Sequence, residues 1–264
     1  MLEQQSLAKS ATGHWYGIAK PFIFALAFWA VLALTWKAAM VFSQRSLTSL
    51  QLARATNLGE LPKYREANAA LKPDPNRVVF FGDSITYQWN ITDANTSYVN
   101  RGIGGQTSGD MLVRFRQDVI NLQPKTVVIL AGVNDFGEHN LGGDENDEHK
   151  LANVEANDQT MAELAELHHI RPVFISLLPL HAYTPHGRIV YRAVPPAMII
   201  ATNRWLRQFC QQHSYPYIDA YSAMVDERGM LRREFSDDGI HPNSAGYEVM
   251  TRVFLAEYSN NHYL

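Results

Sequence analysis

The chain has little cysteine and little excess charge. Cys210 is the one cysteine among 264 residues, so a disulfide within the chain and a metal site built from several cysteines are both excluded. A formal net charge of −3 gives no reason to expect a nucleic-acid partner. The sequence has no internal repeat or low-complexity tract. With 46% hydrophobic and 19% charged residues, it fits one globular domain with an appendage.

The appendage is an apolar segment near the N-terminus. Residues 21–36 carry no charge, and apolar residues resume after Lys37 as far as Phe42. A helix over about 20–42 is long enough to span a bilayer if the Lys37 ammonium reaches the interface. We therefore predict a single-pass transmembrane signal anchor within an N-terminal region of 1–45, with the main domain outside the cytoplasm. A cleaved signal peptide and a buried or interfacial helix are the alternatives.

The rest of the chain alternates between strand-like and helix-like segments. We expect residues 46–74 to form a connector and first helix, and 75–264 to form the catalytic domain. Five short apolar segments predict strands: 78–81, 97–100, 126–131, 172–178 and 217–220. Helical patterns lie between them, which predicts an α/β, doubly wound, flavodoxin-like three-layer sandwich with a mostly parallel five-stranded sheet. We expect long loops over 136–158 and 180–196, the second as a substrate wall.

The first strand leads directly into Gly82-Asp83-Ser84. In an open α/β sheet, ligands gather at the carboxyl ends of the strands. A serine at that edge acts as a nucleophile if a neighbouring group takes its proton. Alone, the segment is equally well explained by Asp83 and Ser84 as turn or helix-capping residues.

Two later segments carry groups that would reach the same edge. Residues 102–105 read Gly-Ile-Gly-Gly, which departs from the dinucleotide-binding fingerprint at its last glycine. We interpret them as a tight loop that exposes a backbone N–H at the start of a helix capped by Thr107 or Ser108. Asn134 follows the strand over 126–131, so its amide is expected near the Ser84 hydroxyl.

Asp238 and His241 lie three residues apart before the final helix. A carboxylate at that spacing accepts a hydrogen bond from one imidazole nitrogen and leaves the other free as a base. A lone histidine is more often a packing or capping residue. The pairing with Asp238, downstream of the serine segment, favours catalysis.

Together these segments resemble the SGNH/GDSL hydrolase superfamily, which is marked by four blocks in fixed order. The resemblance runs from about Arg77 to about Tyr247, and the blocks are Gly82-Asp83-Ser84, the glycine loop ending at Gly105, Gly132-Val133-Asn134, and Asp238-x-x-His241.

The resemblance implies a role for each matching residue. Ser84 would attack an acyl carbonyl, His241 would act as general base and then general acid, and Asp238 would hold the imidazole. The N–H groups of Ser84 and Gly105 and the side-chain amide of Asn134 would form the oxyanion hole. The mechanism implied needs no metal and no cofactor.

We therefore predict a GDSL-type lipase or esterase that cleaves an ester bond through an acyl-enzyme. The alternatives are an O-acyltransferase or deacetylase acting on a cell-envelope glycan, and a non-catalytic, membrane-tethered binding protein. The expected partners are a small-molecule, lipid or glycan ester and the membrane. Trp89 and Phe136, two aromatic residues near the motifs, and Tyr183, in the loop over 180–196, are candidate substrate-binding residues. An α/β-hydrolase is disfavoured because the chain has no Gly-x-Ser-x-Gly segment.

Overall fold

The computed structural model describes residues 28–41, 58–137 and 146–260. The chain divides into two compact units, Met1–Thr56 and Asn57–Leu264. In the first unit, residues 28–41 form a helix, while the remainder of the predicted anchor, 20–27 and 42, lies outside the described residues. Within the described ranges, no helix has both the length and the apolar character needed to cross a membrane.

The second unit is built on a five-stranded parallel sheet with the strand order β2-β1-β3-β4-β5. The strands are β1 Val78–Gly82, β2 Tyr98–Gly102, β3 Thr126–Leu130, β4 Arg171–Ile175 and β5 Tyr217–Ile218. This order has the flavodoxin-like switch between β1 and β3, where ligands bind in doubly wound sheets. The predicted α/β fold with a five-stranded parallel sheet is thus confirmed.

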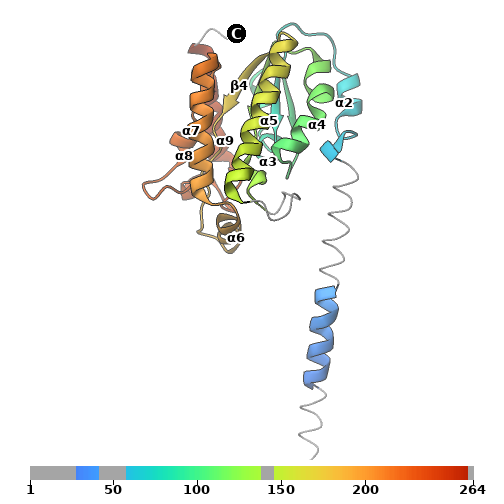
Figure 1. Cartoon of the computed structure of the whole chain (residues 1–264), viewed down its shortest axis with the longest axis vertical. Coiled ribbons are helices and arrows are strands. Elements are labelled where there is room, and N and C mark those ends of the chain that lie inside the picture. Colours follow the sequence, from blue (N-terminus) through green and yellow to red (C-terminus); the bar gives the residue numbers. More distant parts are fainter. Residues whose placement is uncertain (1–27, 42–57, 138–145, 261–264) are drawn as a thin grey trace, which may run out of the picture. The chain divides into compact units, whose positions relative to one another are not determined.

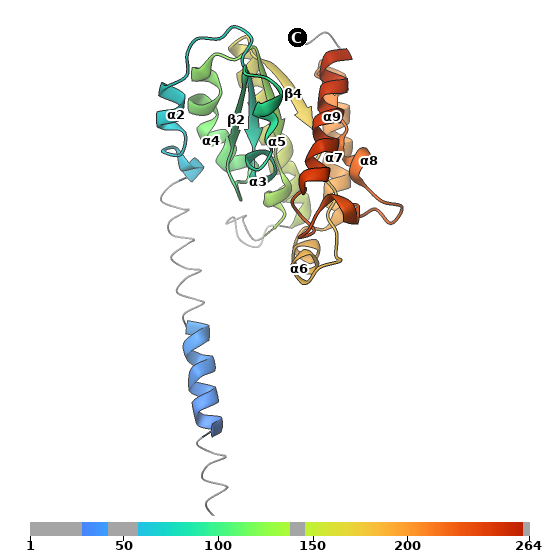
Figure 2. The ribbon, with the colours of Figure 1, turned by 180° about the vertical axis from the view of Figure 1, so that it is seen from behind.

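Helices cover both faces of the sheet because the central strands are apolar on both sides (Figures 1 and 2). Val79 and Phe81 of β1 point to a core shared with α4 (Ser108–Asp118), α5 (Asp147–Leu167) and α7 (Pro196–His213). Val78 and Phe80 point to the opposite core, with α3 (Ser84–Tyr87), α8 (Ala220–Met224) and α9 (Ser244–Asn260). The sheet is therefore the middle of three layers.

Two predicted loops contain helical residues. Helix α5 begins at Asp147, inside the predicted loop over 136–158, because the Asn146 side chain accepts the His149 N–H as N-cap. Residues 138–145 of that loop lie outside the described part. Helix α6 (Pro185–Ala193) lies inside the predicted loop over 180–196, where Thr184 is the N-cap and Pro185 occupies the first turn.

The second unit begins at Asn57, before the domain start predicted at 75. The segment predicted as a connector supplies a 3-10 helix, η1 (Leu58–Glu60), and α2 (Arg65–Ala69), and its residues 46–57 lie outside the described part. Short 3-10 helices elsewhere are η2 (Ile91–Ala94), η3 (Ile120–Leu122), η4 (Val133–Asp135) and η5 (Arg233–Phe235).

Candidate active site

Three loops meet where β1, β2 and β3 end. Ser84 opens α3 directly after β1, and the side chain of Asp83 caps that helix by accepting the Ile85 N–H at 2.9 Å. The glycine loop after β2 passes beside Ser84, since a Cβ built on Gly104 would lie 3.7 Å from the Ser84 Cβ. Sharp turns at this edge keep the serine hydroxyl at the surface rather than in the core.

His241 joins Ser84 to Asp238 in a hydrogen-bonded line. The His241 Nε2 lies 2.9 Å from the Ser84 Oγ, and the His241 Nδ1 lies 2.7 Å from the Asp238 Oδ2. Each of the three side chains is partly exposed. The predicted nucleophile, base and carboxylate are therefore brought together across a sequence separation of 157 residues.

The Asp238 carboxylate is held in its charged form. Its Oδ1 accepts the backbone N–H groups of Ile240 and His241, each at 2.8 Å, and faces the Ser236 hydroxyl at 3.2 Å. Partial burial raises the pKa of Asp238, but the hydrogen bonds from His241 and Ile240 outweigh it and leave the pKa at about 2. Asp238 is thus suited to orient the imidazole and to stabilise its cationic form.

Asn134 contacts the glycine loop and lies near Asp83, the residue before Ser84. The Asn134 Nδ2 donates to the Gln106 carbonyl at 3.0 Å and lies 3.5 Å from the Asp83 Oδ2. Gly105 is half-buried and has a positive φ of 76°, a conformation that favours glycine. The carboxamide of Asn134 is therefore linked directly to the residue that follows Gly105.

Asp135 fixes the position of Asn134 against two helices. The Asp135 carboxylate accepts the Ser108 N–H at 2.9 Å and the Ser108 hydroxyl at 2.6 Å. The Asn157 side chain of α5 in turn donates to the Ser108 Oγ at 2.9 Å. Burial raises the pKa of Asp135 to about 6. Thr107, one of the two expected caps, begins α4 through a capping box with Asp110.

The predicted substrate-binding aromatics occupy different environments. Trp89 is 3% exposed and Phe136 is 1% exposed, and both pack within apolar clusters. Tyr183 is half-buried, and its hydroxyl donates to the Asp226 Oδ2 at 2.7 Å. The side chains of Trp89 and Phe136 therefore belong mainly to the core, because their apolar faces pack against neighbouring elements.

Helix α6 is tied to the loop that carries Asp238. The Thr184 hydroxyl donates to the Asp238 carbonyl at 2.7 Å while its oxygen accepts the Gly187 N–H at 2.8 Å. The predicted wall segment thus contacts the histidine loop through α6. In the described ranges, no three His, Cys, Asp or Glu side chains gather as a metal site would require.

Asp83 gives the site a marked pH dependence of stability. Burial raises its pKa from 3.8 to about 7, against the opposing hydrogen bond from the Ile85 N–H. Between those two values the folded protein retains a proton that the unfolded chain has lost, so this group makes stability fall as the pH rises. Asp135, with a pKa raised to about 6, also makes stability fall as the pH rises. Asp238, whose pKa is lowered, makes stability rise with pH, but only below about pH 4.

We therefore expect Asp83→Asn to reduce the fall in melting temperature between about pH 5 and pH 8. Asparagine keeps the oxygen that accepts the Ile85 N–H but has no titrating proton. Thermal unfolding followed by circular dichroism measures the effect, with the exposed Asp93→Asn as matched control. The same pH slope in wild type and Asp83→Asn would contradict the assignment.

The line from serine through imidazole to carboxylate is the arrangement that serine hydrolases use. Residues 80–249 match the model of the GDSL-like Lipase/Acylhydrolase family. The chain therefore belongs to the GDSL-like lipase/acylhydrolase family and to the class of ester-cleaving hydrolases.

Known proteins resemble the chain in sequence and in structure. An acetylxylan esterase of Geobacillus stearothermophilus is 24% identical over 60% of this chain and 70% of its own length. An uncharacterized lipoprotein of Bacillus subtilis is 29% identical over 39% of this chain, and the match spans 49% of that lipoprotein. A GDSL-like lipase from Bacteroides thetaiotaomicron has a crystal structure that is 33% identical, with a TM-score of 0.67, over 77% of this chain and 99% of the lipase.

Proposed function

We propose that the protein is a serine esterase or acyl hydrolase that works through an acyl-enzyme. The observation that carries the proposal is the 2.9 Å contact of the Ser84 Oγ with the His241 Nε2, whose ring also contacts Asp238 at 2.7 Å. A neutral serine is a weak nucleophile, and an imidazole at this distance takes its proton as the hydroxyl attacks.

The reaction follows in two steps from this geometry. Ser84 adds to the acyl carbonyl while its proton passes to the His241 Nε2, and the imidazolium then gives that proton to the departing alkoxide. Water, activated by the same nitrogen, releases the acid and restores Ser84. The oxyanion formed in each step would be met by the N–H groups of Ser84 and Gly105 and by the Asn134 carboxamide.

The proposal is tested with the full-length chain and p-nitrophenyl acetate. We expect turnover with release of free acetate, because water is the acceptor. Acetyl transferred to an added sugar hydroxyl, with little free acetate, would favour the acyltransferase alternative. Absence of both products would contradict the proposed esterase.

A groove next to the histidine loop, lined by both polar and apolar side chains, favours a glycan ester as the substrate. The groove has a volume of about 810 Å³ and begins at Pro242, the residue after His241. Its wall includes the polar side chains Gln88, Asn90, Asn243, Ser244, Glu248 and Arg252. Ligand sites combine apolar lining with a few polar groups that fix orientation, and the apolar part of this groove includes Trp89, Tyr247 and Leu255. The likeness to an acetylxylan esterase supports the same substrate class.

We expect Glu248→Ala and Arg252→Ala to raise KM for an acetylated xylo-oligosaccharide by about tenfold, since one lost polar contact is worth roughly 1.4 kcal/mol. The kcat for p-nitrophenyl acetate should stay unchanged, because this small ester does not reach the groove. Glu257→Ala, on the same helix outside the groove, serves as control. Equal KM values for the oligosaccharide in wild type and both groove variants would contradict a glycan site here.

We also propose that the segment 20–42 holds the protein at a membrane, with the esterase domain outside the cytoplasm. Support comes from the uncharged run over 21–36 and from the helix over 28–41, where Trp29 is 67% exposed and Trp36 is 71% exposed. Membrane fractionation followed by protease treatment of intact cells tests both parts. A protein that stays in the supernatant at high and low salt would contradict the anchor.

A further inference from the structure

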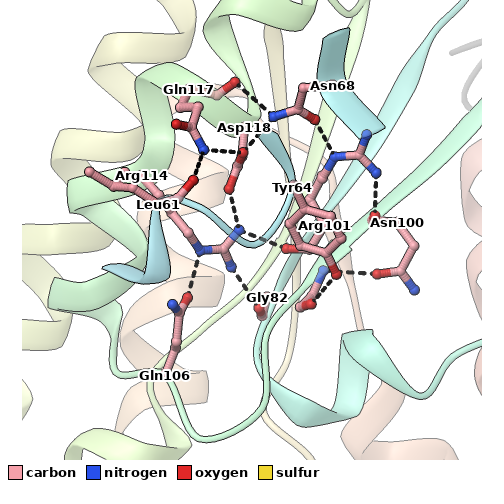
Figure 3. A network of polar contacts seen from close by, with 11 residues as sticks. Leu61, Tyr64, Asn68, Gly82, Asn100, Arg101, Gln106, Arg114, Gln117 and Asp118 are labelled. Atoms are coloured by element: carbon pink, nitrogen blue, oxygen red, sulfur yellow. Dashed lines mark hydrogen bonds and ion pairs between the residues drawn. The ribbon is translucent and has the colours of Figure 1, made fainter. Parts of the chain in front are cut away.

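A buried arginine of α4 contacts two of the three loops that form the proposed oxyanion hole, those after β1 and β2. Arg114 is fully buried, and its guanidinium lies over the Phe81 ring at 4.1 Å from the centroid. Burial lowers its pKa to about 10, so the side chain is still charged at neutral pH. A buried charge is costly unless every donor finds a partner, and Figure 3 shows that each guanidinium nitrogen of Arg114 has one.

Three of those partners flank the reacting groups. Arg114 donates from Nη2 to the Gly82 carbonyl at 3.0 Å, from Nη1 to the Arg101 carbonyl at 2.8 Å, and from Nε to the Gln106 Oε1 at 2.6 Å (Figure 3). Gly82 lies two residues before Ser84. Arg101 and Gln106 stand on either side of the loop that contains Gly105. One planar guanidinium therefore spans the end of β1 and both ends of the glycine loop.

The two loops also contact each other directly at the same carbonyl. The Ile103 N–H donates to the Gly82 oxygen at 3.0 Å, so that oxygen accepts from the glycine loop and from Arg114. The Gln106 carbonyl accepts the Asn134 amide at 3.0 Å. Each predicted oxyanion donor is therefore within two residues, or one hydrogen bond, of a group that Arg114 contacts.

An outer layer of polar residues holds Arg114 in place. Asp118 accepts from the Arg114 Nη1 at 3.3 Å and from the Asn68 Nδ2 at 2.7 Å. Asn68 also accepts from the Arg101 Nε at 2.7 Å, and the Tyr64 hydroxyl donates to the Gly102 carbonyl (Figure 3). The segment predicted as a connector thus contributes to the support of the glycine loop.

We propose that Arg114 is a positioning residue of the oxyanion hole, which holds residues 101–106 against the end of β1 so that the Gly105 N–H faces the oxygen that becomes negative when Ser84 attacks the acyl carbon. The inference rests on the proposed esterase function and adds a residue to it. Arg114 itself does not touch the substrate, so its loss acts on the placement of other donors.

Arg114→Lys is the first test, because lysine keeps the charge but has one nitrogen where arginine uses three. We expect kcat for p-nitrophenyl acetate to fall by about 10–10²-fold with KM within about twofold, as for a small misplacement of a catalytic group. The rate ratio between an oxygen ester and the matching thionoester should also fall, because sulfur gains little from an oxyanion hole. Arg116→Lys, exposed on the same helix, is the control and should match wild type.

Gln106→Met is the second test, which keeps the buried Arg114 charge and removes one of its hydrogen-bond partners. The Gln106 Nε2 has no hydrogen-bond partner among the described residues, so the change removes one contact, that of the Oε1 with Arg114. We expect the same loss in the oxygen-to-thionoester ratio, with a smaller fall in kcat. This variant still tests the positioning role of Arg114 if Arg114→Lys does not fold.

The outcomes separate this inference from the proposed function. Wild-type turnover together with unchanged kcat and ester ratios in the folded variants would overturn the role of Arg114 and leave the esterase intact. A lower melting temperature with unchanged ratios would show a merely structural role and would overturn it too. If the wild type itself does not hydrolyse the ester, the proposed function fails first.

Discussion

Replacing Ser84 with alanine is expected to lower kcat for p-nitrophenyl acetate by about 10⁴–10⁶-fold. The change removes the attacking oxygen, so no acyl-enzyme forms and only water attack assisted by the remaining site is left. In free energy, the loss corresponds to about 5–8 kcal/mol of transition-state stabilisation. The fold should survive, since the hydroxyl makes its hydrogen bond to His241 and is partly exposed. Stopped assays at high enzyme concentration measure the residual rate.

Ser97→Ala is the matched control for that variant. Ser97 precedes β2, so it lies at the amino edge of the sheet, opposite the proposed site. We expect its kcat and KM to equal those of the wild type. A Ser84→Ala protein that keeps its melting temperature and more than about a tenth of wild-type kcat would contradict the assignment of the nucleophile.

Replacing Asn134 with alanine is expected to lower kcat by about 10²–10³-fold, or roughly 3–4 kcal/mol, with little change in KM. Its carboxamide would donate to the oxygen that becomes negative in the transition state, where a fixed donor gains most. The Nδ2 is placed for this role by its contact with the Gln106 carbonyl at 3.0 Å. The loss of that contact in the variant also loosens the loop that carries Gly105.

Asn121→Ala is the control, because Asn121 is exposed and lies beyond the far end of α4. Combining Asn134→Ala with Arg114→Lys adds a second test. We expect the double variant to lose less than the product of the two single losses, since both act on the same oxyanion hole. A loss in kcat equal to that product would indicate independent roles.

The sheet could be predicted from the sequence because its strands are buried on both faces. Val78 to Phe81 and Thr126 to Leu130 are continuous apolar runs, and their regular alternation with helices leaves few possible topologies. The position of Ser84 and Asn134 at one edge then follows, since both come directly after central strands. Spacing alone also suggested that Asp238 and His241 would pair.

Other features depend on contacts between distant residues and could not be predicted in this way. Arg114 shares a helix face with the apolar residues Met111 and Phe115. A charged residue on that otherwise apolar face was the one sign in the sequence that Arg114 has a special role. Nothing in the sequence indicated that its partners would be main-chain carbonyls of Gly82 and Arg101, because those contacts form only in the folded sheet.

The environment of the aromatic residues could not be predicted from the sequence either. Trp89 and Phe136 follow the motifs closely in sequence, which suggested that they line a substrate pocket. The ring of Trp89 packs against Phe80 and Phe254, with centroids 5.4 and 6.0 Å away, and Trp89 also lines the groove proposed for the glycan. Burial of a large ring against its neighbours stabilises the core more than its exposure at a binding site would, and this preference depends on tertiary packing.

The most direct test of the account is covalent labelling of the wild-type chain with a p-nitrophenyl phosphonate, followed by mass spectrometry of the digested protein. We expect one equivalent of label on Ser84, loss of esterase activity in step with labelling, and no label on Ser84→Ala. Label on another residue, or an active enzyme in which Ser84 stays unmodified, would contradict the proposed catalytic site.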